Sequence, residues 1–249
     1  MTKQFGKDEL REMFVGIGEK IVKPLTVYLL GGGAMCFRNQ KVATKDLDLI
    51  FETTGGCAAF ASTLEGLGFE RQRLLAKAYR EMGAEGVWRD KGDHMLDLFT
   101  GKVCGKLEFS EGMKSRAETL GKFGNLSVLM ASNEDVVLFK GVTGRENDVG
   151  DIVSVIRSAP INWRLVLDEC INQSEERVWH GLLFDTLTEI RDKHAIEAPI
   201  RRQLLRLDRK ALIKEAYARY LGEGLSRKEA FAKLAKLGFT PKEIEKSGI

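Results

Sequence analysis

Two aspartates, Asp46 and Asp48, lie two residues apart in KDLDLIF, where charged and apolar residues alternate. The alternation predicts a β-strand, whose period of two puts both carboxylates on one face and Leu47 and Leu49 on the other. Two like charges beside a buried strand are costly unless a cation lies between them, and Mg²⁺ is often bound by one or two carboxylates together with phosphate oxygens. The spacing therefore predicts a divalent-metal site; the simpler alternative is a solvated strand face.

A third carboxylate, Asp97, lies in the middle of HMLDLFT, another sequence typical of a strand. A charge among apolar residues needs compensation, so Asp97 is a candidate third ligand. Three such acids are able to hold two metal ions roughly 3.5–4 Å apart, the arrangement that serves in-line displacement at phosphorus. The acids therefore point to phosphoryl chemistry with two Mg²⁺ ions.

Three consecutive glycines, Gly31 to Gly33, follow the apolar run TVYLL fourteen to fifteen residues before the paired acids. Glycine at the end of a strand lets backbone N–H groups approach phosphates without a Cβ in the way. The spacing does not fit the dinucleotide pattern G-x-G-x-x-G, and no Lys-Ser/Thr follows as a Walker-type loop requires. We predict a phosphate-binding turn of another class.

At these residues the sequence resembles a known superfamily. The stretch LLGGGAMCFRNQKVATKDLDLIF is similar to the signature of the nucleotidyltransferase fold, a glycine turn followed by D-x-D, and in particular to its minimal, antitoxin-like members. The stretch KGVTGRENDVGD, from Lys140 to Asp151, is similar to the helical K…R…D…D segment of that group. Glu146-Asn147 replaces the usual Pro-Lys there. The resemblance covers roughly residues 8 to 158.

The resemblance implies a set of site residues and a reaction. Gly32 and Gly33 would meet the triphosphate of ATP or another nucleoside triphosphate, with Thr44, Lys45 and Lys140 as further phosphate contacts. The metal ligands would be Asp46, Asp48 and Asp97, and Asp97 would also serve as the base. An acceptor hydroxyl would attack the α-phosphate while Mg²⁺ stabilises the developing charge and pyrophosphate leaves. Arg38 is a further phosphate candidate.

Plainer interpretations compete with some of these roles. A helical lysine such as Lys140 is usually solvated. Asp148 and Asp151 fit helix-start and ion-pair positions better than ligand positions. Cys36 is more typical of a small buried residue than of a nucleophile.

The elements that must position these residues follow from periodicity and turn signals. Strands are expected over 26–30, 45–51, 85–90, 94–100 and, more weakly, within 117–131. A helix that Asp8 caps is expected over 10–22, a short one over AMCFR after the glycines, and one over 55–68. From Ser132, whose spacing to Asp135 resembles a capping box, helices are expected over 134–143, 148–158, 163–171, 175–194, 199–221, 226–238 and 240–247.

Composition and charge bound the class of protein. The 249 residues are 43% hydrophobic and 30% charged, which is typical of a folded globular protein. No run of about 18–20 apolar residues and no secretory signal is present, and the four cysteines form no C-x-x-C pair, so we expect no membrane contact and a cytoplasmic location. From Arg201 onward 13 Lys and Arg face 6 Asp and Glu, a balance of +7, whereas the rest of the chain is at −4.

The sequence therefore predicts an α/β fold with a mixed sheet flanked by helices, followed by an all-α region. We place a nucleotidyltransferase-like domain at 1–159 and a helical domain, basic from about residue 201, at 160–249. The acceptor is open: an RNA end, a protein side chain or a small hydroxylated molecule. The alternative function is a non-catalytic regulator or antitoxin-like binding protein that acts through its basic helices, the last two of which also fit a helix-turn-helix.

Overall fold

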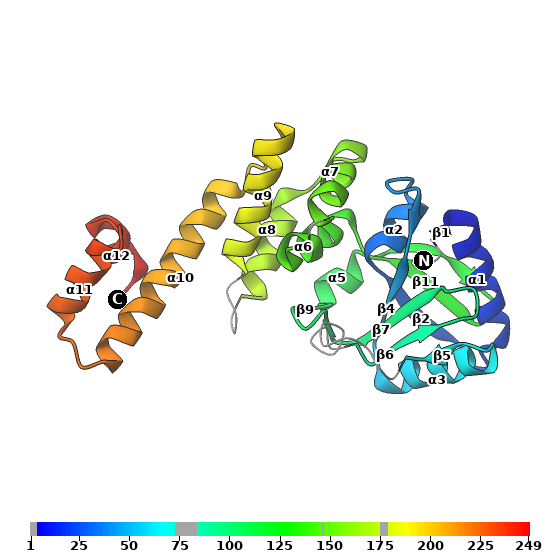
Figure 1. Cartoon of the computed structure of the whole chain (residues 1–249). Helices are drawn as coiled ribbons and strands as arrows, with labels where there is room; N and C mark the ends of the chain where they lie inside the picture. Colours follow the sequence, from blue (N-terminus) through cyan, green and yellow to red (C-terminus); the bar gives the residue numbers. More distant parts are fainter. Residues whose placement is uncertain (1–3, 73–83, 146, 175–178) are drawn as a thin grey trace. The chain divides into compact units, whose positions relative to one another are not determined.

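The computed structural model describes residues 4–72, 84–145, 147–174 and 179–249. The chain divides into two compact units, residues 1–162 and 163–249, which are treated separately below (Figure 1). The predicted division into a domain at 1–159 and a domain at 160–249 stays a proposal.

The first unit is built on a mixed β-sheet. In the described part of the chain this sheet has seven strands in the order β10-β11-β2-β4-β7-β6-β5, with parallel pairing between β11 and β2 and between β4 and β7. The strands are β2 (Leu25–Leu29), β4 (Asp46–Phe51), β5 (Glu70–Arg71), β6 (Gly86–Arg89), β7 (Met95–Thr100), β10 (Glu118–Phe123) and β11 (Leu126–Met130). Four short strands form two small ladders: β1 (Phe5–Gly6) with β3 (Ala43–Thr44), and β8 (Lys102–Val103) with β9 (Leu107–Glu108).

Three helices cover one face of the sheet, namely α1 (Lys7–Lys20), α2 (Gly31–Phe37) and α3 (Thr54–Gly66). Phe51 of β4 packs on Phe60 of α3, with ring centroids 5.1 Å apart, and Leu47 and Leu49 are fully buried. Because side chains alternate along a strand, Asp46 and Asp48 of β4 are left on the opposite face. The apolar face of this strand therefore fixes the direction of its acids.

The described residues of the first unit form three further helices: α5 (Glu111–Ser115), α6 (Asn133–Thr143) and α7 (Asp148–Ser158). The predicted cap at Ser132 is confirmed, since its hydroxyl accepts a hydrogen bond from the Asp135 amide at 3.2 Å. Two expected helix starts are wrong. The first helix is capped by Gly6 rather than Asp8, and α2 begins at Gly31 rather than after the glycines.

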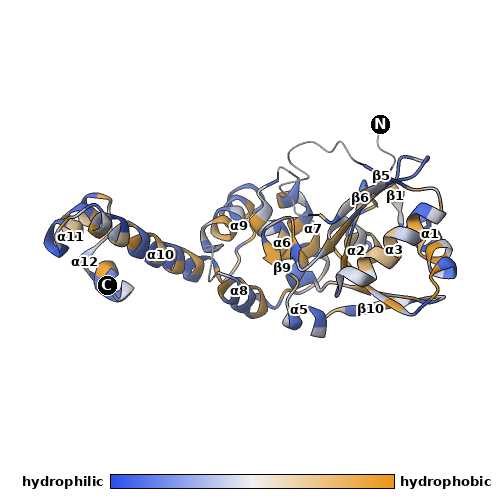
Figure 2. Ribbon diagram, turned by 90° about the horizontal axis from the view of Figure 1, so that it is seen from below, coloured by the Kyte–Doolittle hydropathy of each residue, from blue (hydrophilic) through white to orange (hydrophobic). Residues whose placement is uncertain are grey.

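The second unit is helical throughout its described residues. Its helices are α8 (Trp163–Asn172), α9 (His180–His194), α10 (Arg201–Gly222), α11 (Arg227–Lys236) and α12 (Pro241–Ser247). The expected start of α9 at residues 175–178 lies outside the described residues. Figure 2 shows hydrophobic residues gathered in the sheet of the first unit and hydrophilic residues recurring along α10. The predicted fold class, a mixed α/β sheet followed by an all-α region, is confirmed.

None of the helices in the described part of the chain combines the length and the apolar character that crossing a membrane requires.

Candidate functional site

The three aspartates singled out by the sequence lie on neighbouring strands. In the parallel pair of β4 and β7, Asp48 lies directly opposite Asp97 and Asp46 lies opposite Met95. Register partners point to the same face of a sheet, so the three acids share the face that α1–α3 leave free. We call Asp46, Asp48 and Asp97 the strand acids.

Two strand acids line a cavity of about 540 Å³, which we call the site cavity. Asp46 and Asp48 are partly exposed to it, whereas Asp97 is only 1% exposed and does not line its wall. The lining of the site cavity comes from the segment before β1, the start of α2, the chain from residue 41 into β4, α6, the link to α7 and the first turn of α7. Its residues are Gln4, Gly32, Lys41, Ala43, Thr44, Lys45, Asp46, Asp48, Lys140, Arg145, Asn147, Asp148, Gly150 and Asp151.

Burial makes the strand acids electrostatically expensive. Neither carboxylate oxygen of Asp97 has a hydrogen-bond partner among the described residues. Burial, and then the charges of Asp48 and Asp46, raise the pKa of Asp97 to about 8. Burial and the charge of Asp46 raise the pKa of Asp48 to about 7, although Arg145 and Lys140 act in the opposite direction. A cation between these acids would remove the cost, which is the property expected of a metal site.

The acids are nevertheless not gathered around a preformed metal position. Across the described ranges, no group of three His, Cys, Asp or Glu side chains is arranged to hold a metal ion. Asp46 and Asp48 line the site cavity, and Asp97 lies buried beside them on the neighbouring strand β7.

The glycines before the strand acids form the first turn of α2. Gly31 has a positive φ of +52°, and a Cβ there would lie 2.5 Å from Oδ2 of Asp48. A Cβ on Gly32 would overlap the Thr44 hydroxyl, while Gly33 packs against Leu29 in the core. Glycine is thus required because α2 starts in close contact with the acids and with the loop before β4. Gly32 lines the site cavity and Gly33 does not.

A network of ion pairs closes the opposite side of the site cavity. Lys140 of α6 contacts Asp148 at 2.8 Å and Asp151 at 2.7 Å, both in the first turn of α7. Lys41 contacts the same Asp151 at 2.8 Å, and the Thr143 hydroxyl donates a hydrogen bond to Asp148. Burial opposes the charge of Lys140, but the carboxylates of Asp148 and Asp151 outweigh it and raise its pKa.

Arg145 adds a further cation between α6 and α7. Its Nη2 donates a hydrogen bond to Sγ of Cys104 at 3.6 Å, and its charge opposes the rise in the pKa of both Asp48 and Asp97. The charge of Arg145 therefore favours the ionised form of these two acids. Its guanidinium is hydrogen-bonded to the loop between β8 and β9.

The structure brings most of the predicted residues together. Around the site cavity lie Gly32, Thr44, Lys45, Asp46, Asp48 and Lys140. Arg38 does not belong to it, because its guanidinium donates a hydrogen bond to the Ala131 carbonyl at 2.7 Å and pairs with Glu118 at 3.1 Å. Lys41 was missed, although a lysine between the glycines and the acids was a usable signal. Asp148 and Asp151 are ion-pair partners, as their positions at a helix start indicated.

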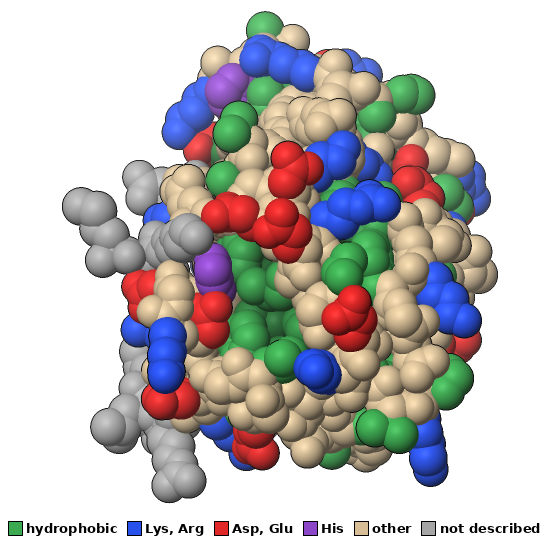
Figure 3. Space-filling model, turned by 90° about the vertical axis from the view of Figure 1, so that its right-hand side faces the viewer, with side chains coloured by type: hydrophobic (Ala, Val, Ile, Leu, Met, Phe, Trp, Pro, Cys, Tyr) green, Lys and Arg blue, Asp and Glu red, His purple; other side chains and the backbone are tan. Residues whose placement is uncertain are grey.

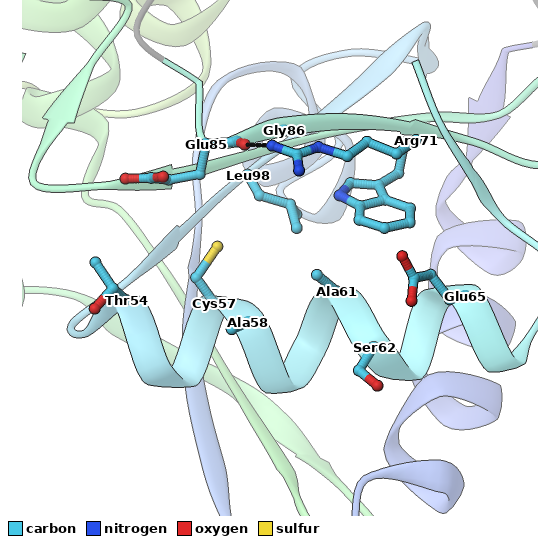
Figure 4. Close-up of a pocket in the computed structure, with 11 residues that line it drawn as sticks. Thr54, Cys57, Ala58, Ala61, Ser62, Glu65, Arg71, Glu85, Gly86 and Leu98 are labelled. Atoms are coloured by element: carbon cyan, nitrogen blue, oxygen red, sulfur yellow. Dashed lines mark hydrogen bonds between the residues drawn. The ribbon is translucent and has the colours of Figure 1, made fainter. Parts of the chain in front are cut away.

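Two other cavities of the first unit have different linings. One of about 290 Å³ lies between α3 and the strands β6 and β7, where Arg71 donates a hydrogen bond to the Glu85 carbonyl at 2.6 Å (Figure 4). Another of about 350 Å³ is lined by Met13, Ile17, Leu67 and Phe69 with acidic residues and His94 beside them. Figure 3 shows an apolar hollow on this side of the molecule. None of the predicted site residues lines either cavity.

Comparisons with known proteins identify a family for this chain. The family model described as "Nucleotidyltransferase of unknown function (DUF6036)" matches residues 19–182. No curated protein matches the chain. Among solved structures, that of ANT(2'')-Ia in complex with adenylyl-2''-tobramycin is 16% identical, with a TM-score of 0.41 over 61% of this chain and 89% of that one.

Proposed function

We propose, from the premise that this chain belongs to the nucleotidyltransferase family DUF6036, that it transfers a nucleoside monophosphate from a nucleoside triphosphate to an acceptor hydroxyl and releases pyrophosphate. The observation that carries the proposal is the pairing of Asp48 with Asp97 at a cavity that Asp48 lines together with Lys41 and Lys140. Acids on one side and cations on the other are what a metal–triphosphate complex requires.

A divalent metal fits the strand acids. The unpartnered carboxylate oxygens of Asp97 and the raised pKa of Asp48 both call for a neighbouring positive charge. Asp46, Asp48 and Asp97 would hold the metal, and hard oxygen ligands of this kind favour Mg²⁺. When bound, the metal supplies Lewis-acid stabilisation of the charge that develops on the phosphate oxygens.

The remaining cavity residues would bind and orient the triphosphate. Gly32, Thr44 and Lys45 lie beside the strand acids and are placed to contact phosphate oxygens. Lys140 offers a cation that two carboxylates already hold in place, so less side-chain entropy is lost when a phosphate approaches. Gly33, which faces the core, would act only through the backbone of α2.

The proposed reaction conserves atoms and charge. The acceptor oxygen forms a bond to the α-phosphorus, the bond from that phosphorus to the β-phosphate oxygen breaks, and pyrophosphate leaves. The acceptor proton passes to the carboxylate of Asp97, which the pairing of β4 and β7 holds next to Asp48. The acceptor is an RNA, a protein side chain or a small hydroxylated molecule.

A second candidate is a regulator that keeps the fold without catalysis. It is favoured by one observation, that the described residues contain no preformed cluster of three metal-ligating side chains. Such a protein would act through its basic helices and would not need the strand acids for its function.

The two candidates are separated by one screen. Nucleoside triphosphates, ATP among them, are incubated with Mg²⁺, total RNA and protein extracts, and pyrophosphate release is measured for the parent, Asp48→Asn and Glu70→Gln. Glu70 lies exposed on β5, outside the site cavity, so Glu70→Gln is a matched control that also removes one acid. Transfer predicts release by the parent and Glu70→Gln but not by Asp48→Asn. Absence of release from the parent with every nucleotide and acceptor favours the regulator.

A further inference from the structure

The long helix α10 carries a row of basic residues at intervals of four. Arg202, Arg206, Lys210 and Lys214 are all exposed, and we call them the basic row. Residues four apart lie one above the other on a helix, so charge recurs about every 6 Å over about 18 Å. Of the buried residues of α10, Leu204 lies on the other side of the helix, whereas Ile213 follows Lys210 by three residues and lies beside the row.

The basic row lacks the ion pairs that the neighbouring arginines make. None of its four members has a carboxylate partner among the residues the structure describes. The paired arginines of the same helix are Arg201 with Glu197, Arg209 with Glu243 and Arg219 with Glu223. Like charges four apart destabilise a helix, so this arrangement is unfavourable unless a partner neutralises it.

The side-chain types of the basic row indicate which kind of partner it binds. A protein interface needs apolar or aromatic anchors at its centre, and the row contains none. A membrane surface would need an apolar face on the same helix, but the exposed Leu205 and Leu212 have Asp208 and Glu215 three residues further on, on their own side. A regular line of cations without anchors matches a regular line of phosphates.

We propose that the basic row binds the phosphate backbone of RNA. The choice of RNA over DNA rests on the proposed function, in which an RNA is one of the acceptor classes. The aromatic side chains nearby pack on each other, with the rings of Tyr217 and Phe231 5.6 Å apart inside the cluster formed by α10, α11 and α12. Bases therefore have no stacking platform in this row, and we expect little sequence preference.

The test compares two quadruple variants of the full chain. In the first, Arg202, Arg206, Lys210 and Lys214 are replaced by Gln, which has a helix propensity close to that of Lys and Arg. In the second, the exposed Lys20, Lys23, Lys91 and Lys122 of the first unit are replaced by Gln. Both variants lose four positive charges, and none of the eight residues lines the site cavity. Binding to bulk tRNA is measured without nucleotide, so that loss of transfer and loss of binding remain distinguishable.

We expect the parent and the first-unit variant to bind tRNA with a steep salt dependence. The basic-row variant should bind at least about tenfold more weakly at 50 mM salt, with a log–log salt slope flatter by about 3. The double variant Arg206→Gln and Lys210→Gln should lie between the two. Circular dichroism checks that α10 stays helical, which removal of like-charge repulsion favours.

Three results would overturn the proposal. The first is equal loss of tRNA binding in both quadruple variants, which would make the effect one of net charge. The second is competition by polyglutamate as strong as by RNA, which would indicate an acidic protein partner. The third is tighter binding of a DNA duplex than of an RNA duplex of the same length.

Discussion

The lysines of the site cavity and the cations of the basic row differ in what lies next to them. Lys140 and Lys41 are held by Asp148 and Asp151 at 2.7–2.8 Å, and the Lys140 side chain is mostly buried. The cations of the basic row are exposed and have no such partners in the described part of the chain. Ion pairs thus hold Lys140 and Lys41 in place, whereas no ion pair among the described residues holds the cations of the basic row.

This difference indicates two kinds of recognition in one chain. A fixed cation gives up little entropy on binding and sets the position of a phosphate relative to the strand acids, which chemistry demands. An exposed cation contributes a salt-dependent attraction without a defined geometry. Substitutions in the two regions should therefore differ in size, in salt dependence and in their effect on folding.

The largest difference is expected for the strand acids. The double variant Asp46→Asn and Asp48→Asn keeps shape but removes two charges from the cavity wall, so Mg²⁺-dependent transfer should fall at least about 10⁴-fold. Triphosphate binding in the presence of Mg²⁺, measured by calorimetry, should fall together with the transfer activity. Unchanged Mg²⁺-dependent triphosphate binding by the folded double variant would contradict the proposed metal site.

A single cation from each region gives a direct comparison of stability. Lys140→Met leaves the buried carboxylates of Asp148 and Asp151 without their shared partner, so the free energy of unfolding should fall by about 3–5 kcal/mol. Arg206→Met removes an exposed and unpaired charge and should change it by less than about 0.5 kcal/mol. Urea titration measures both, and equal losses would contradict the distinction drawn here.

Asp97→Asn should make the metal-free protein more stable, by about 1–3 kcal/mol near pH 8, because an unpartnered buried carboxylate is removed. The folded pKa of about 8 lies well above the ordinary value of an aspartate, so the native state binds the extra proton. Stability of the parent should therefore fall as pH rises between about 4 and 8, and the variant should lose much of that slope. Thermal melts in a chelator at several pH values measure this, and a parallel slope in the variant would contradict it.

A further effect concerns the start of α2. A methyl group on Gly32 would overlap the Thr44 hydroxyl, so Gly32→Ala should cost about 1–3 kcal/mol and weaken triphosphate binding. Gly66→Ala is the control, since at the end of α3 nothing lies within 4 Å of the added Cβ. Equal melting temperatures for the two variants would show that the loop before β4 yields to the added methyl.

The sequence was a good guide wherever one strand face had to be buried. Leu47 and Leu49 are buried, and this fixed the direction of Asp46 and Asp48 without knowledge of the rest of the fold. The spacing of two does not reveal which strand lies beside β4. That Asp97 stands opposite Asp48 depends on the parallel pairing of β4 with β7, a contact between distant parts of the chain.

The ion-pair network was predictable only in part. The sequence predicts helix-start and ion-pair roles for Asp148 and Asp151, because carboxylates stabilise the first turn of a helix. The partner Lys41 escaped notice because it belongs to a loop whose path depends on the pairing of β3 with β1. The exact start of α2 was also missed, since three glycines fit a turn as well as the first residues of a helix.

The central claim is that this chain moves a nucleotidyl group and not a terminal phosphate. Two samples of one nucleoside triphosphate, labelled at the α- or at the γ-phosphate, are incubated with the protein, Mg²⁺ and an RNA or protein acceptor pool. We expect labelled acceptor from the α-labelled sample only and labelled pyrophosphate from the γ-labelled sample. With Asp48→Asn we expect neither of these products. Acceptor labelled from the γ-phosphate, or transfer that survives in Asp48→Asn, would contradict this claim.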